Sequence, residues 1–125
     1  MLMRVLVVDD ELLIRWSLHE ALEAKGWSVT EAGDGRTALK ALTEADELPD
    51  VVLLDYRLPD SNDLQLLASV RRLAPNGKVI LMTAFGTPEV TAGALQLGAY
   101  RVVGKPFEVD EMASLVRRAH DGQPA

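Results

Sequence analysis

The stretch Val51-Val52-Leu53-Leu54-Asp55 is an uninterrupted run of apolar residues that ends in a carboxylate. Two further runs of this kind are Val5–Val8 and Val79–Met82. Continuous β-branched runs that do not alternate with polar residues are typical of strands buried on both faces of a parallel sheet. Two weaker runs, Ser28–Glu31 and Tyr100–Val103, are predicted to form edge strands.

Helical patterns separate these five runs. Apolar spacing and capping residues predict helices at Glu11–Lys25, at Gly35–Asp46 with Asp34 as its cap, from a cap at Ser61 or Asn62 to just before Pro75, from Pro88 to near Gly98, and at Val109–His120. Trp16 lies off the apolar stripe of the first helix and is expected to be partly buried, with a partner surface as the alternative. Strand and helix alternate five times, and right-handed crossovers then give a parallel sheet with helices on both faces.

The composition is that of a single folded domain. The chain has 125 residues, of which 48% are hydrophobic. We expect the domain at residues 1–120 and interpret residues 121–125 as a frayed tail or the start of a linker.

A net charge of −6 argues against binding nucleic acid, and zero cysteines exclude disulfides and thiolate metal sites. No apolar run approaches the roughly 20 residues of a membrane span, so we expect a cytoplasmic protein without a membrane contact.

Polar residues follow the predicted strands at the point where each strand ends. They are Asp9 and Asp10, then Asp55, Thr83 and Lys105. The carboxyl ends of parallel strands meet at one edge of the sheet, where ligands of such folds bind. Converging carboxylates repel one another unless one takes up a proton or a cation lies between them, and Mg²⁺ prefers carboxylate, phosphate and water oxygens. With a lysine and a threonine beside it, this cluster predicts a phosphoryl-transfer site.

Within the cluster, Asp55 is the best candidate nucleophile because it ends the central apolar strand, and Asp9 and Asp10 are better metal ligands. Each residue alone has an ordinary explanation, since aspartate and threonine commonly cap turns and helices. The convergence of all five residues at the ends of four strands favours a functional site.

In this order and spacing, the motifs of the chain resemble the receiver domain of bacterial two-component response regulators. The motifs are Val7–Glu11, Ala32–Gly35, Asp50–Asp55, Leu58–Pro59, Met82–Ala84, Leu97–Ala99 and Gly104–Phe107. The segments Leu58–Leu64 and Met82–Gly86 look most like receivers of the nitrogen-regulation type, which precede an ATPase module and a DNA-binding module. The resemblance covers nearly the whole chain and implies an α/β, flavodoxin-like, doubly wound (βα)5 fold with strand order 2-1-3-4-5.

The resemblance also implies which residues hold the metal and accept the phosphoryl group. Asp55 is expected to take a phosphoryl group from a sensor histidine kinase. Asp10 and Asp55 are expected to ligate Mg²⁺ through their side chains and Asp9 mostly through water. Arg57 is expected to ligate it through its backbone carbonyl.

Three further residues receive roles from the resemblance. Thr83 is expected to bond a phosphoryl oxygen and draw its loop inward, Lys105 to pair with the aspartyl phosphate, and the small Ala84 to leave room for the phosphodonor. The Lys105–Pro106 bond is expected to be cis. Phosphorylation is then expected to alter the face formed by the fourth helix, the fifth strand and the fifth helix. This face is expected to control an output domain in transcription regulation, and a homodimer through the same face is the other expected partner. Such a domain is a switch that catalyses only its own phosphorylation and dephosphorylation.

Two residues depart from the family pattern. The family usually has Tyr or Phe three residues before the lysine, where this chain has Val102, and the nearest aromatic residue is Tyr100. The common glycine of the loop after the third strand is Asp63. Both departures favour an alternative in which the domain only docks to a partner, whereas the complete set of site residues favours phosphorylation.

Two other classes of protein remain as alternatives. An aspartyl-nucleophile phosphatase needs a second acid two residues after the nucleophile, where this chain has Arg57. A flavin-binding protein of similar topology needs a Ser/Thr/Gly-rich phosphate loop after the first strand, where this chain has Asp9 and Asp10.

Overall fold

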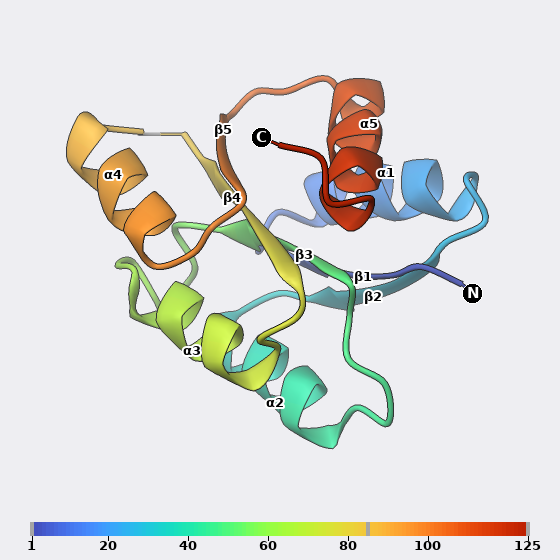
Figure 1. Ribbon diagram of the computed structural model, residues 1–125, viewed down its shortest axis with the longest axis horizontal. Coiled ribbons are helices and arrows are strands. Elements are labelled where there is room, and N and C mark those ends of the chain that lie inside the picture. Colours follow the sequence, from blue (N-terminus) through green and yellow to red (C-terminus); the bar gives the residue numbers. More distant parts are fainter. Residues whose placement is uncertain (1, 85, 125) are drawn as a thin grey trace.

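Five strands and five helices alternate along the chain in the computed structural model, which describes residues 2–84 and 86–124 (Figure 1). Met1 and Ala125 of the predicted domain and tail, and Phe85 of the predicted family motif, lie outside the described residues. The elements are β1 (Arg4–Val8), α1 (Leu12–Glu23), β2 (Ser28–Ala32), α2 (Gly35–Glu44), β3 (Val51–Asp55), α3 (Gln65–Leu73), β4 (Lys78–Thr83), α4 (Pro88–Gln96), β5 (Arg101–Gly104) and α5 (Val109–His120).

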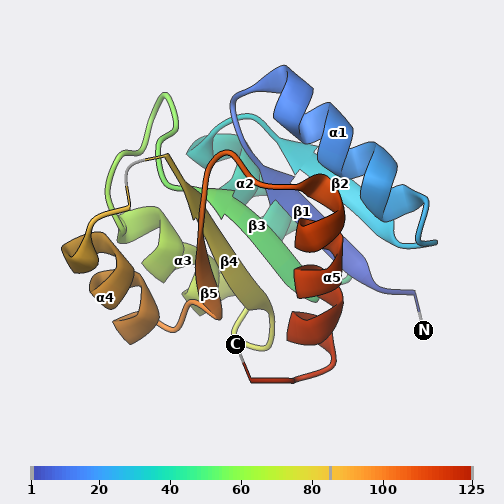
Figure 2. The ribbon, with the colours of Figure 1, turned by 90° about the horizontal axis from the view of Figure 1, so that it is seen from above.

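The strands form one parallel sheet in the order β2-β1-β3-β4-β5, so the predicted fold class and strand order are confirmed. Helices α1 and α5 cover one face of the sheet, and α2, α3 and α4 cover the other (Figure 2). β3 is central, and all five of its residues are buried. Its apolar side chains alternate between the two cores, with Leu53 on the α1–α5 side and Leu54 on the opposite side. Burial on both faces therefore explains why this run carries no polar residue before Asp55.

The helix signals in the sequence mark most helix ends. The Asp34 side chain accepts a hydrogen bond of 2.7 Å from the Thr37 N–H and caps α2. Pro88 is the first residue of α4, and α5 has the predicted bounds. The helices α1 and α2 each end two residues earlier than predicted, and Gly26, with φ of 85°, turns the chain after α1.

The predicted cap of α3 is wrong. Neither Ser61 nor Asn62 caps this helix, which begins at Gln65. The reason is a tight turn, in which Leu58 and Ser61 exchange two backbone hydrogen bonds of 2.8 and 3.2 Å. The Asp63 carboxylate instead accepts a hydrogen bond of 2.9 Å from the Gln65 N–H.

The partial burial predicted for Trp16 is also wrong, because Trp16 is 59% exposed. It shares the outer surface of α1 with Leu12 and Leu13. In the part of the chain that is described, every helix is too short or too polar to cross a lipid bilayer.

Candidate functional site

Three carboxylates meet at the carboxyl edge of the sheet. Asp9 and Asp10 follow β1, and Asp55 is the last residue of the neighbouring strand β3. One oxygen from each lies within 4.8 Å of the others. Asp9 is fully buried and Asp55 nearly so, whereas Asp10 is exposed. The predicted convergence of these residues is therefore present, and it follows from the parallel arrangement of β1 and β3.

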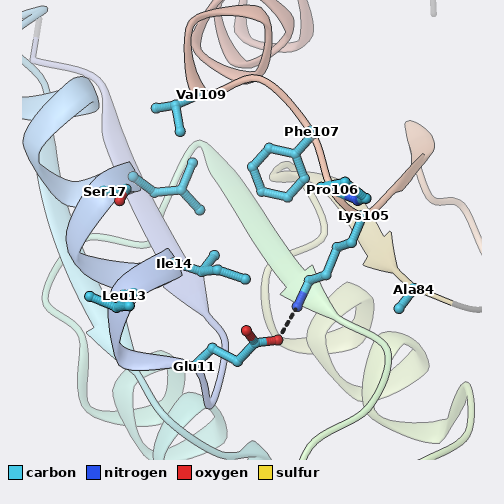
Figure 3. Close-up of a pocket in the computed structure, with 10 residues that line it drawn as sticks. Glu11, Leu13, Ile14, Ser17, Ala84, Lys105, Pro106, Phe107 and Val109 are labelled. Carbon is cyan, nitrogen blue, oxygen red and sulfur yellow. Dashed lines mark hydrogen bonds and ion pairs between the residues drawn. The ribbon is translucent and has the colours of Figure 1, made fainter.

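Lys105 supplies the positive charge of the cluster. It follows β5, and its peptide bond to Pro106 is cis, as the resemblance implies. Its Nζ lies 2.8 Å from Asp9 Oδ2 and 3.2 Å from Asp55 Oδ2. It also lies 3.4 Å from Glu11 Oε1 at the start of α1 (Figure 3). The ammonium thus bridges the ends of three strands.

The surroundings of Asp55 disfavour the ionised form of its carboxyl group. Burial, helped by the Asp9 carboxylate and opposed by Lys105, raises the pKa of Asp55 from 3.8 to about 6. Burial alone lowers the pKa of Lys105, but its contacts with Asp9 and Asp55 outweigh that effect and raise the pKa above its ordinary value. At neutral pH the site therefore holds a protonated lysine and a carboxylate that is ionised at a cost.

The residues present fit a divalent cation. Asp9 Oδ2 is buried and lies 2.8 Å from the Lys105 ammonium, which it shares with Asp55. Three carboxylates and one ammonium leave two negative charges. Oxygens on opposite sides of Mg²⁺ lie about 4.2 Å apart, so small movements or an intervening water would bring the three carboxylates into coordination range.

The other predicted site residues lie around this cluster. Thr83 is buried at the end of β4, and its carbonyl accepts a hydrogen bond of 2.8 Å from the Lys105 N–H. Ala84 follows it and is exposed beside Lys105. The Arg57 N–H points to Asp55 Oδ1 at 3.4 Å, which places the backbone of Arg57 beside the acidic cluster. Its carbonyl as a metal ligand stays a prediction.

Tyr100 does not occupy the place of the aromatic residue that the family has at position 102. Tyr100 packs with the core on the α1–α5 side of the sheet, and Val102 packs with the core on the opposite side. The Tyr100 hydroxyl instead donates a hydrogen bond of 2.6 Å to the carbonyl of Gln123, beyond α5. The aromatic side chain is therefore an anchor for the chain after α5.

The sequence reasoning missed three residues that support the site. Glu11 pairs with Lys105, and Arg15 donates a hydrogen bond of 2.8 Å to the Asp9 carbonyl. The Asp60 carboxylate accepts hydrogen bonds of 2.8 and 3.0 Å from the first two N–H groups of α2 and so fixes the loop after β3. Of these three residues, only Glu11 could have been found from the sequence, because it follows Asp9 and Asp10 directly.

The fold and the site together define a flavodoxin-like α/β domain with an acidic site at the carboxyl edge of its sheet. Residues 5–117 match the model of the family "Response regulator receiver domain", and the chain belongs to this family. Receiver domains are phosphorylation-dependent signalling domains of two-component systems and, as a class, not enzymes.

Similarity to individual proteins supports the assignment to this family. The chain is 41% identical to the DNA-binding transcriptional regulator NtrC of Escherichia coli over 92% of its own length and 24% of NtrC. It is 34% identical to the sporulation initiation phosphotransferase F of Bacillus subtilis, over 92% of its own length and 91% of that protein. The crystal structure of a CheY-like receiver domain protein from Methanospirillum hungatei superposes with a TM-score of 0.91 at 28% identity, covering 98% of this chain and 97% of that one.

The similarity to NtrC confirms the predicted resemblance to the nitrogen-regulation type. The chain spans about a quarter of the length of that regulator, and its matching part is the receiver domain.

Proposed function

We propose that this domain is a phosphorylation switch in which Asp55 accepts a phosphoryl group from a sensor histidine kinase. The observation that supports it most is the meeting of Asp55, Asp9 and Asp10 within 4.8 Å, with the Lys105 ammonium 3.2 Å from the Asp55 carboxylate. This arrangement combines a nucleophile, a candidate cation site and a fixed positive charge, which are the parts that phosphoryl transfer needs.

The chain's own residues perform the transfer as follows. An oxygen of Asp55 attacks the phosphorus of a phosphohistidine and forms an O–P bond, while the N–P bond breaks and its electron pair returns to the imidazole. Lys105 already contacts Asp55 Oδ2 and pairs with the acyl phosphate that forms there. Thr83, at the neighbouring strand end, donates its hydroxyl to a phosphoryl oxygen and moves toward it. Ala84 leaves the approach open.

Asp10 and Asp55 would hold Mg²⁺ directly, with Asp9 mostly through water and Arg57 through its carbonyl. When bound, the ion lowers the repulsion between the incoming phosphoryl oxygens and the carboxylates. The Asp9 carboxylate supports this assignment, because it is fully buried and shares one ammonium with Asp55, so a cation would compensate the remaining negative charge.

A groove beside the site supports a protein as the phosphodonor. It has a volume of about 410 Å³, lies between α1 and the loop from β5 to α5, and has Lys105 and Ala84 among its lining residues (Figure 3). The rest of its wall is mainly apolar, and the neighbouring Leu12, Leu13 and Trp16 of α1 are 67%, 77% and 59% exposed. We assign this surface to the histidine kinase, because its occupant would reach Asp55 past Ala84.

The outcome of phosphorylation is carried by the face of α4, β5 and α5. Leu95 and Leu97 are 49% and 40% exposed at the end of α4 and provide apolar surface for an output domain or a second copy of the chain. Gly93 of α4 leaves room for the side chain of Leu64, the residue before α3, since a Cβ there would lie only 2.8 Å from Leu64 Cδ1. We propose transcription regulation in the cytoplasm as the output of the whole protein, with residues 1–120 as the switch and no nucleic-acid contact by this domain.

The test is incorporation of a phosphoryl group from a small acyl phosphate with Mg²⁺, followed by intact-mass analysis. We expect one added phosphoryl group on the wild-type chain and none on Asp55→Asn or after chelation of Mg²⁺. The matched control is Asp50→Asn, which changes the carboxylate at the opposite end of β3 and retains incorporation. Labelling of Asp55→Asn at the wild-type level contradicts the proposal. Failure of the wild type to incorporate the group supports a docking module instead.

The docking groove has its own test. We expect Leu13→Ser to slow transfer from a phosphorylated histidine kinase that labels the wild type, and to leave transfer from the small acyl phosphate unchanged. The control Leu48→Ser removes another exposed leucine, which lies in the loop before β3 and is 42% exposed against 77% for Leu13. Equal kinase rates in the two variants would remove the groove from this role.

A further inference from the structure

Asp9 is held by several neighbouring groups at the candidate cation site. Its N–H donates to the Ala32 carbonyl in β2 at 3.0 Å, and its Oδ1 accepts from the Glu11 N–H at 2.9 Å. Its backbone carbonyl accepts a hydrogen bond of 2.8 Å from Nη1 of Arg15 in α1. Arg15 therefore ties the turn that carries Asp9 and Asp10 to the first helix.

Arg15 is itself fixed by other side chains. Its Nε lies 3.0 Å from Glu31 Oε1 in β2, and the other Glu31 oxygen lies 2.7 Å from His19 Nδ1. Gly33 leaves space for the guanidinium, because a Cβ at that position would lie 3.2 Å from Nη1. A planar guanidinium presents Nε and Nη donors at fixed angles, so one side chain bonds a carboxylate and a carbonyl together. A lysine ammonium does not reproduce this geometry.

We propose that Arg15 is a positioning residue, which holds the Asp9–Asp10 turn in the arrangement that binds a divalent cation. The inference rests on the cation site of the proposed function. Two effects of Arg15 on that site have opposite signs. Its positive charge repels a cation, whereas its hydrogen bond keeps the carboxylates in place. Positioning dominates because the charge is already paired with Glu31, while the hydrogen bond acts directly on the backbone of Asp9.

The sign of the change in Mg²⁺ affinity distinguishes the two effects. The experiment is a Mg²⁺ titration of the whole chain, followed by backbone amide shifts. We expect Arg15→Gln to weaken binding about tenfold, the lower end of the range for groups that orient metal ligands. Arg15→Lys keeps the charge and is expected to weaken binding nearly as much. A purely electrostatic role predicts tighter binding by Arg15→Gln and unchanged binding by Arg15→Lys.

Two further variants test the route through Glu31. Glu31→Gln is expected to weaken Mg²⁺ binding less than Arg15→Gln does, and to add nothing in the Arg15→Gln background. The matched control is Arg4→Gln, which removes an arginine paired with Glu47 at the amino end of the sheet. We expect it to leave Mg²⁺ affinity unchanged.

Phosphoryl incorporation at saturating Mg²⁺ separates positioning from general damage. The Arg15→Gln rate is expected to return to the wild-type rate there, because the cation restores the turn. A rate that stays low at saturation, or an affinity equal to or tighter than wild type, overturns the inference. If Arg15→Gln does not fold, the Arg15→Lys affinity decides in the same way. If the wild type itself binds no Mg²⁺, the proposed function fails and this inference with it.

Discussion

Asp50 and Asp55 stand at opposite ends of the same strand, and their surroundings differ in kind. Asp50 precedes β3, and its carboxylate accepts a hydrogen bond of 2.8 Å from the Arg4 N–H. Its backbone N–H donates to the Arg4 carbonyl, and its carbonyl accepts from the Lys78 N–H. Asp50 thus joins β1, β3 and β4 at their amino ends, using ordinary hydrogen bonds.

Asp55 ends β3 in a site where its charge is poorly compensated. It is 5% exposed, lies among the oxygens of Asp9 and Asp10, and has a pKa raised to about 6. The Asp50 carboxylate at the amino end therefore stabilises the fold. The ionised Asp55 carboxylate at the carboxyl end destabilises it, and a bound cation or a phosphoryl group would relieve that destabilisation. This difference shows that an aspartate does not by itself indicate a functional site. Burial of its carboxylate without full charge compensation does.

The largest expected difference between the two ends is in cation binding. We expect Asp10→Asn to weaken Mg²⁺ binding by roughly a hundredfold, because loss of a direct ligand exceeds most outer-shell effects. Asp50→Asn is expected to leave the affinity at the wild-type value. Calorimetric titration of both variants measures the contrast, and equal affinities would remove Asp10 from the metal site.

The second difference is in the free energy of unfolding without Mg²⁺. A pKa raised from 3.8 to about 6 corresponds to about 3 kcal/mol, which screening at the open mouth of the site reduces to about 2 kcal/mol. We therefore expect Asp55→Asn to raise the stability at pH 7.5 by about 2 kcal/mol. Asp50→Ala is expected to lower it by about 1 kcal/mol, because it leaves the Arg4 N–H without its acceptor. Urea unfolding with a chelator present measures both changes.

The pH dependence of stability follows from the same pKa. The folded-state pKa of Asp55 lies above the unfolded value, so folding takes up a proton between pH 3.8 and about 6. The contribution of Asp55 therefore becomes more favourable as the pH falls through this window. We expect the advantage of Asp55→Asn over the wild type to shrink as the pH falls from 7.5 to 4. An advantage that is independent of pH would show that ionisation of Asp55 is not its cause.

The fold was predictable because its signals are local. The run Val51–Leu54 is apolar without alternation because β3 is buried on both faces, and Asp34 and Pro88 mark helix starts through hydrogen bonds and backbone angles close in sequence. The same reasoning placed Asp9 and Asp55 at one edge, since parallel strands share a direction. Local signals failed at α3, where the turn between Leu58 and Ser61 delays the helix.

The supporting residues of the site were not predictable, because their partners are distant in sequence. Asp60 bonds the N–H groups of Gly35 and Arg36, and Arg15 bonds Glu31, 16 residues away. Asp60 follows a proline in a motif typical of turns, so its bonds to α2 gave no local signal. Such contacts depend on which strands become neighbours, and strand order came from the resemblance to a family.

The smallest expected effect is that of a substitution at Tyr100. It tests whether residues at the amino end of β5, like Asp50 at the amino end of β3, affect stability but not the site. Tyr100 precedes β5, at the amino end of the sheet, and holds Gln123 through its hydroxyl. Because that hydrogen bond is exposed, we expect Tyr100→Phe to lower the stability by at most about 1 kcal/mol. Mg²⁺ affinity and phosphoryl incorporation are expected to stay at wild-type values, since Tyr100 packs on the opposite side of the sheet from Val102. Hydrogen exchange is expected to accelerate only at the end of α5 and beyond. Loss of phosphoryl incorporation in Tyr100→Phe would instead show that an amino-end residue controls the site.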